Sequence, residues 1–94
     1  MGRVFDWDKF NLRKIRAHRI KVEEVESALS HAPIAIYEQD VDSEMRYVYY
    51  GETDAARLLA VVLVERGEKI RVVTAYDLDA GQKRDYFARR LRGE

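Results

Sequence analysis

The chain has 94 residues and a mass of 11.0 kDa, and 47% of its residues are hydrophobic. This composition predicts one domain over residues 1–94 and excludes wholesale disorder. No cysteine is present, which excludes disulfides, thiolate metal sites and a cysteine nucleophile, and the 17 basic residues are balanced by 17 acidic ones.

Two helices are predicted in the first third of the chain. Val4–Trp7 is either a short strand or the apolar segment that leads into a helix. Asp8 is the expected N-cap of a helix ending near Ala17, because its carboxylate can accept the first free backbone N–H groups. A break at Arg19-Ile20 precedes a second helix over Val22–Ser30, which Pro33 ends. Four residues of the first helix segment recur at helical spacing, opposite a basic face: Trp7, Asn11, Ile15 and His18.

The middle of the chain has the pattern of strands. Four strands are expected: Ile34–Tyr37, Met45–Tyr50, Leu58–Glu65 and Lys69–Ala75. An acidic turn region over Glu38–Glu44 separates the first two. Leu58–Glu65 is continuously apolar and β-branched, which is typical of a central strand that is buried on both faces. The last two strands form a hairpin, and strict alternation places Ile70, Val72 and Thr74 on one face of it.

A third helix is predicted from Asp79, because Asp79 and Gln82 have the spacing of a capping box. Its apolar side consists of Tyr86, Phe87 and Leu91, and its other side is basic. Two helices, then four strands, then one helix predict an α+β fold: a mainly antiparallel sheet with the helices on one face.

The zero net charge hides a segregated distribution. Residues 9–21 carry six bases and no acid, residues 22–54 carry nine acids and one base, and residues 55–94 carry nine bases and six acids. The basic helices at the two ends of the chain are therefore compatible with an anionic partner, despite the zero net charge. The other interpretation is a set of solvated helix faces that neutralise one another in the fold.

The candidate chemistry is that of Lys, Arg, His and Tyr. His18 and His31 lack the spacing of a metal site, and no glycine-rich phosphate loop is present. RNA cleavage suits such a set, because an imidazole can transfer protons, a guanidinium can clamp phosphate, and a phenol can stack on a base. Each group also has a structural interpretation: His18 as a packed histidine, Arg71 as the partner of an acid, and the tyrosines as sheet packing.

The chain resembles the BrnT family of toxins. In the first half the resemblance rests on Phe5-Asp-Trp-Asp8, Asn11, Ile15–Ile20 and Val22–Glu26. In the second half it rests on Gly51, Arg57-Leu-Leu59, Val61–Val64, Gly67–Ala75 and Tyr86. The resemblance implies a RelE-like fold and a toxin of a type II toxin–antitoxin module that cleaves RNA without a metal or cofactor. It also implies a ribbon-helix-helix antitoxin as partner, in addition to RNA.

The resemblance assigns roles to particular residues. The expected catalytic set is His18, Arg57, Arg71, Tyr76 and Tyr86, with His18 transferring protons and Arg57 and Arg71 on the phosphate. The expected RNA-binding set is Trp7, Lys14, Lys83, Arg84, Arg89 and Arg90.

Two departures from the family pattern bear on these assignments. The family's usual His-Gly-Val break is His18-Arg19-Ile20 here, which puts the turn in question because glycine adopts positive φ more easily than arginine. Many members have Ala-Arg where this chain has Ala75-Tyr76, so Tyr76 is considered as the substitute for a phosphate-binding arginine.

Two alternatives to the ribonuclease stay open. One is a non-catalytic module that binds RNA or protein on the same fold, and the other is an interaction protein whose tyrosine-rich sheet forms a homo-oligomer. A cytoplasmic, bacterial protein is expected in each case, because the N-terminus lacks an apolar leader. The longest apolar run, Leu58–Val64, is also far below the roughly 20 residues of a membrane helix.

Overall fold

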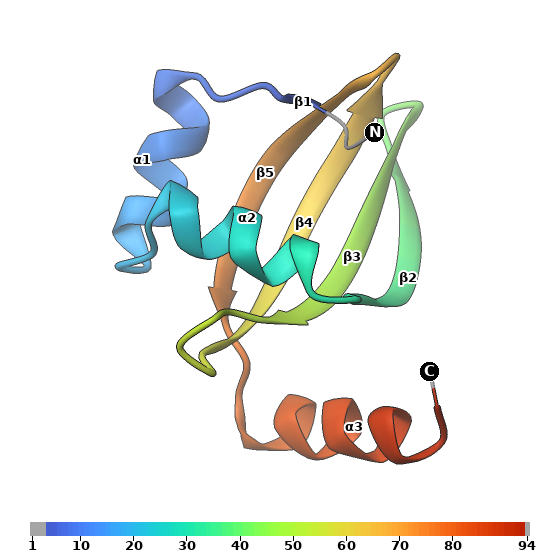
Figure 1. The fold of residues 1–94 in the computed structure, drawn as a ribbon. Coiled ribbons are helices and arrows are strands. Elements are labelled where there is room, and N and C mark those ends of the chain that lie inside the picture. Colours follow the sequence, from blue (N-terminus) through green and yellow to red (C-terminus); the bar gives the residue numbers. More distant parts are fainter. Residues whose placement is uncertain (1–3, 94) are drawn as a thin grey trace.

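The computed structural model describes residues 4–93 and combines three helices with a five-stranded sheet. The elements in chain order are β1 (Val4–Phe5), α1 (Lys9–Ala17), α2 (Val22–Ser30), β2 (Ile34–Val41), β3 (Glu44–Glu52), β4 (Leu58–Arg66), β5 (Lys69–Asp77) and α3 (Ala80–Leu91). The strands lie in the order β1-β5-β4-β3-β2, and only the β1–β5 pair is parallel. Figure 1 shows α1 and α2 over one face of the sheet, and α3 beyond the end of β5.

Each face of the sheet carries its own hydrophobic cluster. On the first face, Ile15 of α1 and Val25 of α2 pack against Leu59 and Val61 of β4. On the second face, Tyr86 of α3 packs with Tyr50, Leu58, Ala60 and other side chains. Strand β4 is therefore buried on both sides, as its continuous apolar sequence predicts.

The helix starts confirm the predicted caps. Asp8 accepts hydrogen bonds from the backbone N–H groups of Phe10 and Asn11, each at 2.9 Å. Asp79 and Gln82 form the reciprocal capping box of α3. The helix α2 has no conventional N-cap residue, but Glu24 accepts the backbone N–H of Lys21 at 2.9 Å. Local hydrogen bonds thus define where each helix begins.

The turn between α1 and α2 places Arg19 in a backbone conformation that favours glycine. Arg19 has φ of 58°, in the left-handed region, and Ile20 behind it is 1% exposed. A non-glycine residue in this region costs on the order of 1 kcal/mol. The turn therefore forms at an energetic cost, and the packing of Ile20 in the first-face cluster compensates for it.

Helix α2 approaches strand β3 so closely that one position of the strand, Gly51, must be a glycine. A side chain at Gly51 on β3 would collide with the backbone carbonyl of Ala28 in α2. Gly51 and Ala28 are both buried, so α2 lies directly on β3 at this point. Only a residue without a Cβ allows that contact.

The structure corrects four expectations. The sheet has five strands instead of four, because Val4-Phe5 pairs with Lys69-Ile70. The acidic segment is mostly strand, and its turn is only Asp42-Ser43, both at positive φ. The β4–β5 register shifts after Val62, so that Ala75 faces the same side as Ile70 and Val72. Finally, α3 packs against the face opposite α1 and α2 instead of joining them.

None of the helices within residues 4–93 is long and apolar enough to cross a membrane.

Candidate functional site

Arg57, just before β4, is the centre of a hydrogen-bond network at one end of the sheet. Its Nε and Nη2 donate to the two carboxylate oxygens of Asp77 at 2.7 and 2.9 Å. Its Nη1 donates to Glu24 and to the carbonyl of Arg19, both at 3.0 Å, and its Nη2 reaches the carbonyl of His18 at 3.5 Å. A guanidinium has five N–H donors, so every donor of Arg57 is engaged.

This network joins three separate segments of the chain. Asp77 ends β5, Glu24 lies in the first turn of α2, and the two carbonyls belong to the turn after α1. The sequence analysis expects Arg57 to bind phosphate, but the guanidinium has no donor left for one in this arrangement. We infer that Arg57 positions the His18 turn against the sheet.

The charges of the network stabilise one another. The hydrogen bond from Arg57 is the largest effect on Asp77 and lowers the pKa of that carboxyl, while partial burial opposes it. The pKa of Glu24 is also lowered, first by the backbone N–H of Lys21 and then by Arg57. Reciprocally, the bond to Asp77 raises the pKa of Arg57. All three groups are therefore ionised near neutral pH, as the tight hydrogen bonds require.

His18 and Tyr76 lie together beside this network. His18 is the C-cap of α1 and is exposed, and its ring centroid is 6.2 Å from that of Tyr76 at an interplanar angle of 52°. His18 and Lys83 both contribute to lowering the pKa of Asp77, so both lie near its carboxylate. We call His18, Tyr76 and Lys83, which surround Asp77, the β5 corner.

The β5 corner brings together part of the predicted catalytic set. His18, Arg57 and Tyr76 meet there, although their sequence separations are 39 and 19 residues. Lys83 joins them from the predicted RNA-binding set. The C-terminal end of α1 and the first turns of α3 thus converge at the end of β5, while the two helices themselves lie on opposite faces of the sheet.

Arg71 lies elsewhere, near the other end of β5. Its Nη2 is 2.6 Å from Oδ2 of Asp8, so it ties the start of α1 to the sheet. Five residues of strand separate it from Tyr76, or about 16 Å at the usual rise per residue. The structure therefore does not bring Arg71 to His18, and Arg71 pairs with an acid at the start of α1 instead of an acid on a neighbouring strand.

Trp7 has a structural contact of its own. Its indole Nε1 donates to Glu26 of α2 at 2.9 Å, and its ring stacks on Phe5 with centroids 6.2 Å apart. Trp7 also packs against the first-face cluster. Its predicted contact with RNA has no observation in its favour.

Tyr86, predicted to be catalytic, is 1% exposed and belongs to the second-face core. Its hydroxyl accepts a hydrogen bond from Nε of Arg90 at 3.1 Å. Arg90 also binds the carbonyl of Ala32 at 2.6 Å, and Arg89 pairs with Asp85 at 3.1 Å. Tyr86 is closed off from solvent in this conformation, so its expected catalytic role has no geometric support here and stays a prediction. Arg90 therefore ties α3 to the segment before β2, whereas the pair of Arg89 and Asp85 lies within α3.

Lys14, Lys83 and Arg84 are the exposed members of the predicted RNA-binding set. Lys14 lies in α1, one helical turn before His18, whereas Lys83 and Arg84 lie in the first turns of α3. Of the three, Lys83 is the one whose charge acts on Asp77.

Sequence reasoning missed the carboxylates of the site. Asp77 and Glu24 both bind Arg57, yet neither was singled out. The hairpin register offers a signal for Asp77, because it pairs Leu59 with Asp77 and so brings Arg57 close to the end of β5. No comparable pattern points to Glu24. Among residues 4–93, no group of three or more His, Cys, Asp or Glu side chains is arranged to hold a metal ion.

Comparison with known protein families identifies the family to which the chain belongs. Residues 7–81 match the family described as the ribonuclease toxin BrnT of type II toxin–antitoxin systems. The chain belongs to the BrnT family. The match spans His18, Arg57, Arg71 and Tyr76 and ends in the first turn of α3, before Tyr86. A search of curated proteins found no match. The BrnT family implies a ribonuclease toxin, an RNA substrate and an antitoxin partner.

Proposed function

We propose that this BrnT-family chain cleaves RNA at the β5 corner without a metal ion. The observation that carries the proposal is the exposed His18 ring beside Tyr76, on a turn that Arg57 fastens to the sheet. Imidazole is the side-chain group whose proton exchange lies closest to neutral pH. A rigid turn that presents it to solvent suits proton transfer with a bound substrate.

The proposed step uses the 2′-hydroxyl of the RNA. His18 takes the hydroxyl proton while the 2′-oxygen forms a bond to the adjacent phosphorus, and the bond from phosphorus to the 5′-oxygen breaks. Water supplies the proton that the 5′-oxygen needs, so the products end in a 2′,3′-cyclic phosphate and a 5′-hydroxyl. Lys83 stabilises the extra negative charge on the phosphate, and Tyr76 contacts the neighbouring base. The hydroxide that this water leaves takes the proton from His18, so the chemistry needs only water and groups of the β5 corner.

The proposal is tested with a short single-stranded RNA and its 2′-deoxy counterpart in excess EDTA. We expect cleavage of the RNA to persist in EDTA, with 2′,3′-cyclic phosphate ends, and the 2′-deoxy strand to stay intact. Loss of cleavage in EDTA that added Mg²⁺ restores would refute metal independence. Equal cleavage of both strands would refute the role of the 2′-hydroxyl.

A second candidate is a binding module without catalysis. It is favoured by the full engagement of Arg57 and by Tyr76 at a position where many members have arginine, because both reduce the positive charge at His18. Under this alternative, the chain retains RNA in a salt-dependent manner but leaves it uncut. The cleavage assay above separates the two.

We further propose a ribbon-helix-helix protein as the antitoxin and the cytoplasm as the site of action. Expression of the chain alone is then expected to arrest growth. Co-expression with a ribbon-helix-helix protein encoded beside it is expected to restore growth. Unimpaired growth during accumulation of folded protein would count against a toxin.

A further inference from the structure

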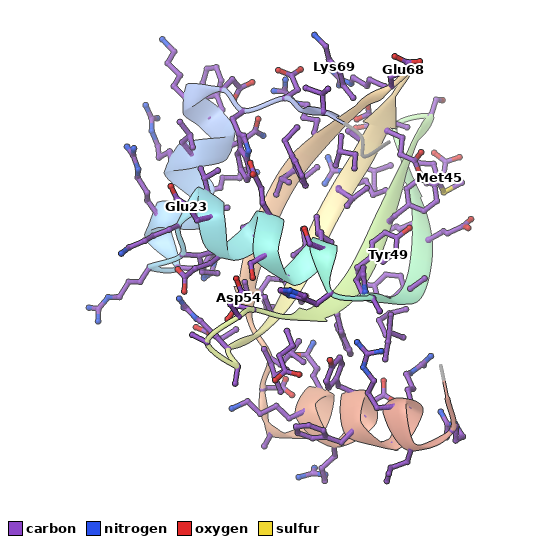
Figure 2. All side chains as sticks on the ribbon, viewed as in Figure 1. Glu23, Met45, Tyr49, Asp54, Glu68 and Lys69 are labelled. Carbon is purple, nitrogen blue, oxygen red and sulfur yellow. The ribbon has the colours of Figure 1, made fainter. Side chains whose placement is uncertain are left out.

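The second face of the sheet is only partly covered. Tyr86 of α3 packs near the β5 corner with Tyr50, Leu58 and Ala60. Val64 lies farther along β4 and is not part of that cluster, yet it is 1% exposed. Figure 2 labels Glu68 and Lys69 at the hairpin tip, at the end of the sheet far from α3. Something other than α3 must therefore cover Val64.

Two arginines flank Val64 on the neighbouring strands. Arg71 of β5 is its direct cross-strand partner. Arg46 of β3 is the next position after the Tyr47–Leu63 pair, which places it beside Val64. Both point to the second face, because they alternate with residues of the first-face cluster. Arginine stems can cover apolar surface while the guanidinium stays at the edge, which accounts for the burial of Val64.

Arg46 differs from the other arginines of the sheet. Its side chain is partly buried, its Nε is fully buried, and no hydrogen-bond partner for that atom exists among the described residues. By contrast Arg57, Arg66 and Arg71 each contact a carboxylate. A buried donor without a partner is costly, so such a group calls for a ligand or another explanation.

The surroundings of Arg46 indicate the kind of ligand. Arg46 and Arg71 are separated by one strand, or about 10 Å between their Cα atoms at the usual strand spacing. Arg71 is already paired with Asp8 at 2.6 Å, so the guanidinium left for an anion is that of Arg46, and guanidinium binds phosphate oxygens in a bidentate manner. The strip continues over Val62 and Thr74 to Tyr76, which belongs to the β5 corner.

We propose that Arg46 binds a phosphate group of RNA on this strip, with Arg71 beside it, while another part of the same strand lies at the β5 corner. This inference rests on the proposed function, since it takes RNA as the ligand. A single nucleic-acid strand fits better than an acidic protein segment, because the strip leads from Arg46 to the aromatic ring of Tyr76 beside His18. Bases stack on such rings.

The test measures binding separately from cleavage. A fully 2′-O-methylated RNA strand is bound by the full-length wild-type chain, by Arg46→Gln and by the matched control Arg66→Gln, whose arginine pairs with Glu44 at 2.9 Å on the surface. We expect Arg46→Gln to weaken binding about tenfold, as for the loss of one charge-assisted contact. The slope of log K against log salt should fall by about 0.7, as for one phosphate contact on a single strand. Arg66→Gln should change affinity by less than about twofold.

A stability measurement guards against a merely structural role. Because the Nε of Arg46 has no hydrogen-bond partner among residues 4–93, Arg46→Gln breaks no hydrogen bond of that atom, and any loss of stability should come from the shorter stem over Val64. RNA affinities are therefore compared where both variants are folded. Equal RNA affinity of Arg46→Gln and Arg66→Gln under these conditions would overturn the proposal.

Two further outcomes are decisive. Stronger competition by polyglutamate than by RNA of equal charge would overturn the proposal in favour of an acidic protein partner. Binding that depends on Arg46 without any cleavage of ordinary RNA would support this inference and refute the ribonuclease proposal.

Discussion

The substitution Arg57→Lys tests whether Arg57 holds the site together or binds phosphate. Lysine keeps the positive charge, but it has three donors on one nitrogen and cannot span Asp77, Glu24 and the two carbonyls at once. At least two of the five hydrogen bonds must be lost. The predicted result is a less stable protein whose charge is unchanged.

The magnitude follows from the exposure of the groups. A hydrogen bond to a charged group contributes about 1.5–3 kcal/mol when shielded from solvent. The side chain of Arg57 is 27% exposed and that of Asp77 is 55% exposed, so screening places each contribution at the low end. We therefore expect Arg57→Lys to lower the free energy of unfolding by about 2–3 kcal/mol. For a domain of this size, that lowers Tm by roughly 10–20 °C.

The assay combines thermal unfolding with RNA binding at a temperature where both proteins are folded. Arg66→Lys is the control, because its single exposed contact with Glu44 should contribute less than about 1 kcal/mol. The slope of log K against log salt for RNA should be the same for Arg57→Lys and wild type. A variant with unchanged Tm and a reduced slope would refute the positioning role and restore Arg57 as a phosphate ligand.

Three further predictions concern other parts of the chain. Arg19→Gly should raise the free energy of unfolding by about 1 kcal/mol, because it relieves the positive φ. Arg13→Gly, in the middle of α1, should lower it by about the same amount, and equal effects of the two would contradict the assigned turn. Tyr86→Phe should retain RNA cleavage, whereas Tyr86→Ala should cost about 3–5 kcal/mol of stability; a folded but inactive Tyr86→Phe would show that Tyr86 is catalytic. The folded pKa of Asp77 lies below its usual 3.8, so the stability it contributes is present above that pH and is lost as the pH falls further. Urea titrations from pH 6 to 2 should therefore show a shallower decline for Asp77→Asn than for wild type, and parallel curves would contradict the ion pair.

Local patterns predicted most of the secondary structure. Asp8, Asp79 and Gln82 mark helix starts because capping depends on the nearest few residues, and Leu58–Glu65 marks a central strand because its burial is continuous. The strand β1 could not be predicted firmly, because two residues are too few to show the alternating pattern of a strand. It forms through its pairing with β5. The shifted β4–β5 register likewise has no local signature in Val73 or its neighbours.

The candidate site was harder to predict because it depends on contacts between distant segments. His18 and Tyr76 were both singled out, yet only the fold shows that their rings lie together. Arg57 was identified by type but assigned to phosphate, since one sequence does not show that its donors are all taken. Tyr86 was assigned to catalysis because burial cannot be read from a residue that occurs both in cores and in active sites.

The most direct test of a metal-free site at His18 is the single-turnover rate of RNA cleavage in EDTA by His18→Ala, with His31→Ala as control. The two are the only histidines of the chain, and His31, the C-cap of α2, pairs with Asp54 at 3.0 Å. Removal of a proton-transfer group typically costs a factor of about 10²–10⁴. The account predicts such a loss for His18→Ala and a wild-type rate for His31→Ala, with both variants folded. Cleavage by His18→Ala at the wild-type rate would contradict it.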